Sequence, residues 1–143
     1  MTHLLTLKAD KNELASAQLE KLPYLQIANF ANNKIVDIKG IEHPLLESLN
    51  LSFNNIYEVT DLDPSALPRM TTLELRNNRL ITTNGIGVLS NLQKLYLAAN
   101  SLKFLENLDR MQHLVSIHLR DNQLEKLDGF SANMKLLQYL NLR

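Results

Sequence analysis

Few residues in this chain have the types and spacing that catalysis or metal binding requires. The four histidines lie in separate stretches of the sequence, at positions 3, 43, 113 and 118, so we do not expect them to share a metal ion. Cysteine is absent, which excludes disulfides, thiolate metal sites and cysteine nucleophiles. The sequence contains no phosphate-binding glycine loop, no His-Glu-x-x-His pair and no Gly-x-Ser-x-Gly elbow. We therefore predict no enzymatic activity, no metal and no cofactor.

Amide side chains, by contrast, recur at a regular spacing. An asparagine amide both donates and accepts hydrogen bonds, so a column of such side chains can satisfy backbone groups where neighbouring strands end. The consecutive members of this series stand 21, 21, 24, 22 and 22 residues apart. We predict that they form a structural ladder made of Asn12, Asn33, Asn54, Asn78, Asn100 and Asn122.

Each of these asparagines is the ninth position of a repeat, Leu-x-x-Leu-x-Leu-x-x-Asn-x-Leu, in which other apolar residues also stand for leucine. Six complete copies begin at Leu4, Leu25, Leu46, Met70, Leu92 and Leu114. Period-two alternation directs the fourth and sixth positions inward and predicts a short strand in every copy. One copy cannot bury its apolar row alone, so the copies must stack and share a core.

A seventh copy begins but is truncated before its asparagine. It opens with Leu137, Leu140 and Leu142 and stops at Arg143. Residues 1–143 are therefore expected to form one domain of six complete repeats plus a truncated seventh, and to be a fragment of a longer protein. An uncapped repeat exposes apolar core, so we also predict self-association through these three leucines.

The pattern resembles that of the leucine-rich-repeat superfamily, in the class with a period near 22 residues. The resemblance implies an α/β solenoid with a curved parallel sheet on its concave face and 3₁₀ or short helical turns on its convex face. Apolar steps of three, as in Ile35-Ile38-Ile41, fit 3₁₀ turns. Helical turns are predicted over residues 15–22 and 63–67, and Gly85-Ile86-Gly87 is predicted to be a plain turn.

Charge and hydropathy predict a cytoplasmic protein that binds neither nucleic acid nor membrane. Basic and acidic residues number 15 each, so the formal net charge is zero and no overall field attracts anionic partners. The N-terminus lacks the basic and apolar regions of a signal peptide. No apolar run approaches the roughly 20 residues that cross a bilayer.

The outward-facing strand positions are where a protein partner is expected to bind. The third, fifth and seventh positions of each copy face the concave side. In the N-terminal half these residues are small and neutral, whereas the C-terminal half gathers aromatic and basic side chains, which are favoured interface anchors. We predict a partner-binding face made of Glu74, Arg76, Lys94, Tyr96, His118, Arg120 and Tyr139. The alternative is that these exposed side chains only pack on one another.

Several segments resemble, more narrowly, the leucine-rich-repeat proteins of the ciliary radial spoke. They include Leu73-Glu74-Leu75-Arg76, His118-Leu119-Arg120-Asp121-Asn122 and Gln138-Tyr139-Leu140-Asn141-Leu142-Arg143. This resemblance implies a non-enzymatic scaffold in the axoneme, which supports the motility of cilia and flagella and binds other radial-spoke or axonemal proteins.

Two other functions stay open from the sequence alone. A regulatory subunit of a protein phosphatase would cover a catalytic subunit with its concave face. Such a subunit is expected to bring acidic and aromatic residues to a basic enzyme, whereas this face leans basic. A nuclear repeat protein in an RNA-processing complex would instead hold an RNA-binding partner, without direct contact to RNA.

Overall fold

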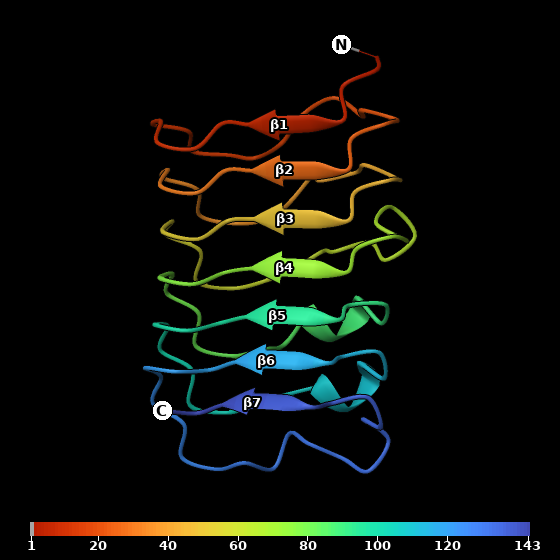
Figure 1. The fold of residues 1–143 in the computed structure, drawn as a ribbon. Helices are drawn as coiled ribbons and strands as arrows, with labels where there is room; N and C mark the ends of the chain where they lie inside the picture. The colour runs from red at the N-terminus through yellow and green to blue at the C-terminus, as the bar shows by residue number, and fades with distance from the viewer. Residues whose placement is uncertain (1) are drawn as a thin grey trace.

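The computed structural model describes residues 2–143. Seven short strands pair in parallel, in chain order, into one sheet (Figure 1). The strands are β1 (Thr6–Lys8), β2 (Ile27–Asn29), β3 (Ser48–Asn50), β4 (Thr72–Glu74), β5 (Lys94–Tyr96), β6 (Ser116–His118) and β7 (Tyr139–Asn141). Two 3₁₀ helices, η1 (Ile86–Val88) and η2 (Leu108–Arg110), lie in the segments that lead into β5 and β6. The predicted leucine-rich-repeat solenoid with a parallel sheet is therefore confirmed.

The core is a stack of equivalent apolar side chains from successive copies. Residues at the same repeat position pair across the sheet, as Leu49 does with Leu73 and Leu73 with Leu95. The middle residue of each strand from β2 to β6 is buried, whereas the residues on either side of it face outward. The sixth position adds a second buried column, made of Phe30, Leu51, Leu75, Leu97 and Leu119.

The ladder asparagines connect neighbouring copies. Asn78 donates through Nδ2 to the carbonyl oxygens of Leu51, at 2.9 Å, and Leu75, at 3.1 Å. Its Oδ1 accepts the backbone N–H of Ile56 at 2.9 Å. The same bonds recur at Asn33, Asn54, Asn100 and Asn122. Asn12 differs, because its amide donates only within its own copy, to the carbonyls of Ala9 and Asp10.

The helical turn predicted over residues 15–22 is wrong. The backbone N–H of Gln18 donates to Ser16 Oγ at 3.0 Å, and that of Leu22 donates to His43 Nδ1 at 3.1 Å. These N–H groups therefore bond to side chains and not to the carbonyls of a helix, so the segment stays irregular.

Residues 63–67 form a turn and not a helix. Asp63 caps the turn, since its Oδ1 accepts the Ser65 N–H at 2.8 Å and its carbonyl accepts the Ala66 N–H at 3.1 Å. The turn stops at Pro68, which has no N–H to continue it.

The steps of three apolar residues lie mostly in the core, but not all of them form the predicted 3₁₀ turns. Ile35, Ile38 and Ile41 belong to the core and lie in irregular chain. A 3₁₀ helix forms where only a turn was predicted, at Gly85-Ile86-Gly87. Gly85 directly precedes η1 and has a left-handed φ of 87°. Glycine suits that conformation because it has no Cβ.

The last strand leaves apolar side chains accessible. Leu140 and Leu142 are exposed, and Leu137 is partly buried against the core. The self-association predicted through these leucines stays a prediction. Within residues 2–143, no helix has the length and apolarity needed to cross a bilayer.

Candidate functional site

The outward side of the seven strands, which we call the sheet face, has two unlike halves. In the N-terminal half, fifth-position amides bond to their own backbone. Asn29 Oδ1 accepts the Ala31 N–H at 3.0 Å, and Asn50 Oδ1 accepts the Ser52 N–H at 2.9 Å. Ala31 and Ser52 are buried. The asparagine amides of this half therefore bond within their own copy, whereas the buried Ser52 hydroxyl has no hydrogen-bond partner among the described residues.

The C-terminal half carries a row of three stacked rings, which we call the aromatic row. Tyr96 pairs with His118 in the register of β5 and β6, and their ring centroids lie 4.5 Å apart with planes 20° apart. The ring of Tyr139, on β7, lies 4.9 Å from that of His118 at 37°. The first pair is stacked and the second is tilted, and both arrangements are favourable at these distances, so the row is preformed.

Arginines flank the aromatic row, and each is paired with an acid. The Arg76 guanidinium lies over the Tyr96 ring, 5.3 Å from its centroid, and donates to Glu74 Oε2 at 2.7 Å. Arg120 Nε lies 2.9 Å from Asp121 Oδ2. The basic charge read from the sequence is therefore largely offset within the face itself.

The electrostatic surroundings of His118 keep it neutral. Burial of the imidazole lowers the pKa of His118 below the ordinary value of 6.5, and the positive charge of Arg76 lowers it further. The neutral imidazole of His118 is therefore favoured, and with the two tyrosine rings it forms a largely apolar surface with polar edges.

A hollow of about 310 Å³ opens beside this row. Four of the seven predicted residues line it, namely Arg76, Tyr96, His118 and Arg120. Of the other three, Glu74 pairs with Arg76 and Tyr139 stacks on His118, while Lys94 is exposed on β5 away from the hollow.

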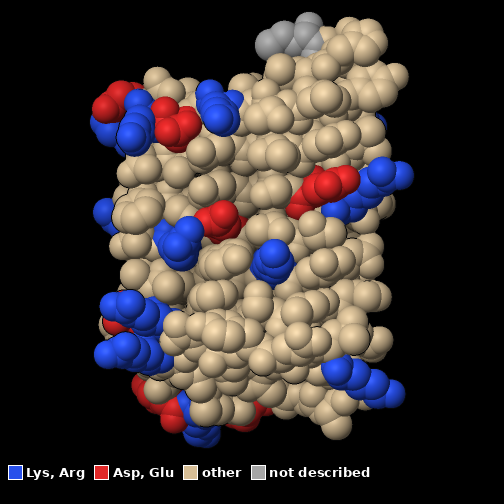
Figure 2. Space-filling view, in the orientation of Figure 1, with Lys and Arg blue, Asp and Glu red and all other residues tan. Residues whose placement is uncertain are grey.

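The sequence prediction missed residues that shape the hollow: Asn77, Ala98, Ala99, Asp121 and Asn141. The sequence could have indicated one part of the hollow. Ala98 is the seventh position between Arg76 and Arg120, and a methyl group between two long side chains leaves space. Figure 2 shows the face with few charged side chains at its centre, and with lysine and arginine side chains along the left edge of its lower half.

Known proteins share this architecture. Residues 45–70 match the family described as Leucine Rich Repeat. YopM from Yersinia enterocolitica superposes with a TM-score of 0.77 at 25% identity, over 98% of this chain and 29% of that one. The internalin InlF from Listeria monocytogenes gives 0.76 at 26% identity, over 99% of this chain and 42% of that one. The chain therefore has the parallel-sheet solenoid fold of these proteins, and one of its copies matches the leucine-rich-repeat pattern.

Curated relatives match this leucine-rich-repeat chain from end to end. Leucine-rich repeat-containing protein 23 of Bos taurus and that of Homo sapiens are each 57% identical to it over 143 residues, which is 100% of this chain. The chain spans 42% and 41%, respectively, of the length of those relatives. Repeats of this type typically act as non-enzymatic scaffolds that bind proteins.

The four histidines of this leucine-rich-repeat chain lie in four separate settings. His118 belongs to the aromatic row, and His3 stacks on Tyr24 with ring centroids 5.3 Å apart. His113 Nδ1 lies 3.0 Å from the Ser90 carbonyl oxygen, and His43 is buried, with Nδ1 accepting the Leu22 N–H. Within residues 2–143, no three histidine, aspartate or glutamate side chains are grouped as metal ligands.

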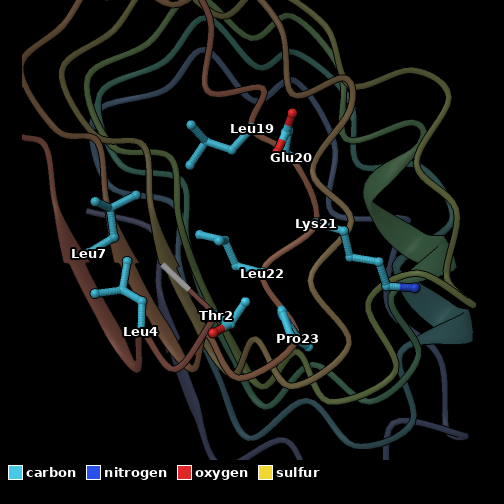
Figure 3. A pocket seen from close by; sticks show the side chains of 8 residues that line it. All are labelled: Thr2, Leu4, Leu7, Leu19, Glu20, Lys21, Leu22 and Pro23. Carbon is cyan, nitrogen blue, oxygen red and sulfur yellow. The ribbon is translucent and has the colours of Figure 1, made fainter.

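A second hollow, of about 360 Å³, lies within the first turn (Figure 3). The side chains of Leu4, Leu7, Leu19 and Leu22 lie around one space, whereas that of Lys21 extends away from it. Leu4 and Leu7 hold the positions that Leu25 and Ala28 fill as buried core in the next copy. This hollow continues the apolar core column.

Proposed function

We propose that this leucine-rich-repeat chain binds a protein partner through the C-terminal half of its sheet face. The observation that carries the proposal is the aromatic row of Tyr96, His118 and Tyr139, flanked by Arg76 and Arg120. Tyrosine and arginine supply large contact areas and dominate the energetics of many interfaces. Because the rings already stack in the free chain, little side-chain entropy is lost when a partner covers them.

The charges around the row can accommodate carboxylates of a partner, with a small gain from each. The ion pairs of Arg76 and Arg120 are exposed, and pairs of that kind contribute about 0–1 kcal/mol. A carboxylate on the partner can therefore replace Glu74 or Asp121 at little cost. Lys94, exposed on β5, adds a positive charge without any ion pair within residues 2–143.

The biological setting that we propose is the axonemal radial spoke of motile cilia and flagella, with other spoke or axonemal proteins as partners. The support is the resemblance of three segments to leucine-rich-repeat proteins of the radial spoke. Those segments contain most of the candidate face: Glu74, Arg76, His118, Arg120 and Tyr139. Three of these residues, Arg76, His118 and Arg120, also line the hollow.

The test is affinity capture from a lysate of ciliated cells, with three versions of the chain. The first is the wild type, and the second combines Tyr96→Ala with Arg120→Glu. The matched control combines Ile27→Ala with Lys8→Glu, which removes one exposed apolar and one exposed basic side chain from the N-terminal half of the same face. We expect radial-spoke proteins to be lost by about tenfold or more in the second version alone.

Other outcomes would redirect the proposal. Capture of a phosphatase catalytic subunit, or of RNA-processing proteins, would overturn the spoke assignment and support one of the two functions left open by the sequence. Equal capture of spoke proteins by all three versions would overturn the assignment of the sheet face. Circular dichroism of each version checks that the substitutions leave the fold intact.

A further inference from the structure

A second column of exposed apolar side chains runs along the flank of the solenoid, just beyond the asparagine ladder. We call it the flank stripe. Its members come from four consecutive copies. In the first three of these copies the member lies three residues after the ladder asparagine, and in the fourth it lies four residues after it. They are Val36, Tyr57, Ile81 and Phe104, which are 44%, 52%, 62% and 43% exposed.

Backbone hydrogen bonds hold the stripe in register. The N–H of Ile56, the residue before Tyr57, donates to Asn78 Oδ1 at 2.9 Å, and its carbonyl accepts the Arg79 N–H at 2.8 Å. The same two bonds recur at the residues before Val36 and Ile81. Ile81 and Phe104 then line one hollow of about 530 Å³. The backbone beside Val36, Tyr57 and Ile81 is therefore held in one register, and Ile81 and Phe104 share one hollow.

The core does not need these side chains. In each copy the neighbouring residue, such as Ile56 or Leu80, is fully buried and fills the interior. Single exposed apolar residues are ordinary on protein surfaces. An exposed apolar side chain at the same position in three successive copies, with Phe104 one position further along in the fourth, is instead typical of an interaction surface.

We propose that the flank stripe binds an amphipathic α-helix of a protein partner, laid along the solenoid axis. Adjacent strands lie about 4.8 Å apart, and a helix rises about 5.4 Å per turn. Across four copies the two spacings drift apart by only about 2 Å. One apolar residue per helical turn can thus meet one stripe residue per copy, as in other helix-in-groove complexes.

Charges beside the stripe specify the chemistry of that helix. Lys103 precedes Phe104 and lines the same hollow, and Arg79 lies two residues before Ile81; both are exposed and form no ion pair within residues 2–143. Asp37 and Glu58, by contrast, directly follow Val36 and Tyr57, so the basic charge is confined to the C-terminal end of the stripe. At the other end Lys34 is already paired with Glu13. The helix should therefore carry aspartate or glutamate on the flank that faces Arg79 and Lys103. None of these residues belongs to the sheet face, so the stripe is a separate surface, and only the choice of lysate in its test rests on the radial-spoke setting proposed above.

Site-specific photo-cross-linking tests the proposal directly. The chain carries p-benzoylphenylalanine in place of Ile81 and is illuminated in a lysate of ciliated cells, after which the cross-linked segment is sequenced by mass spectrometry. The matched control carries the same group in place of Phe53, which is 52% exposed and lies outside the stripe. We expect the substituted position 81 alone to capture a segment with apolar residues three and four apart and acidic residues along one flank.

Two further measurements sharpen the result. Adding Arg79→Glu and Lys103→Glu should lower the cross-link yield about tenfold, because like charges then face each other. A synthetic peptide of the captured segment should gain helical circular dichroism when the chain is added. A segment without helical periodicity, a cross-link to a second copy of this chain, or a product no stronger than that of the Phe53 control would overturn the proposal.

Discussion

Replacing Asn78 with alanine tests whether the asparagine ladder holds neighbouring copies together. The amide nitrogen donates to the carbonyls of Leu51 and Leu75, and Oδ1 accepts the Ile56 N–H. Leu51, Ile56 and Leu75 are fully buried, so water cannot take the place of the lost amide without opening the structure.

The expected loss in unfolding free energy depends on which of these backbone groups keep a hydrogen-bond partner in the variant. The Leu51 carbonyl still accepts from Asn54 at 3.0 Å, and the Leu75 carbonyl from Asn100 at 2.9 Å. The Ile56 N–H keeps none, and a buried donor without an acceptor costs about 1–3 kcal/mol. Adding about 0.5 kcal/mol for each of the two weakened carbonyls gives a loss of about 3 kcal/mol. For a chain of this size that is a drop of about 10 °C in Tm.

The assay is urea unfolding followed by circular dichroism, with Asn12→Ala as the matched control. Asn12 holds the same repeat position but is exposed, and its amide bonds only within its own copy. Its replacement should change the unfolding free energy by less than about 0.5 kcal/mol. If Asn78→Ala were as mild as that control, the Ile56 N–H would have found another acceptor, and the account of the ladder as a connection between copies would be refuted.

Three further predictions concern stability and can be checked by the same unfolding assay. Gly85→Ala should cost more than about 2 kcal/mol, because φ is 87° and the added Cβ would lie 1.9 Å from the Val59 carbonyl oxygen. Burial lowers the pKa of His43 below its ordinary value of 6.5 in the folded chain. As the pH falls, His43 is therefore protonated in the unfolded chain before it is protonated in the folded chain. Stability should therefore fall from about pH 7 to about pH 5, and His43→Gln should reduce that fall. Phe53→Asn should add about 1 kcal/mol, because Phe53 has a φ of 58°, which asparagine tolerates better.

The strands and their register were predictable because burial alone determines them. One position of the repeat is occupied by Leu49, Leu73 and Leu95 in successive strands. A shift of the strand register by one residue would move all three side chains from the core to the solvent. Each copy must bury the same positions, so the spacing of the apolar residues predicts the strands without knowledge of any contact between copies.

The segments behind the sheet were harder to predict, because their partners are distant in sequence. The Leu22 N–H bonds to His43, 21 residues away, and nothing in residues 15–22 indicates that acceptor. Local helix preference is weak enough for one such bond to override it. At residues 63–67 the signal was present, since Pro68 forbids the next helical turn.

The side chains of the sheet face were placed by alternation, but their pairing was not. Glu74 and Arg76 are two residues apart on one side of a strand, so alternation could have indicated their ion pair. The pair of Arg120 with Asp121 could not be read in this way, because alternation sends adjacent residues to opposite sides. Asp121 has a left-handed φ of 57°, which breaks the alternation at that position.

This pairing changes what the face can offer a partner. If Arg76 and Arg120 were unpaired, an acidic partner would gain new charge contacts, and added salt would weaken binding strongly. With Glu74 and Asp121 already in place, a partner's carboxylate exchanges one exposed pair for another, and the net gain is small. The affinity must then come mainly from covering the aromatic row, so removal of the Tyr96 ring should weaken binding more than a rise in ionic strength does.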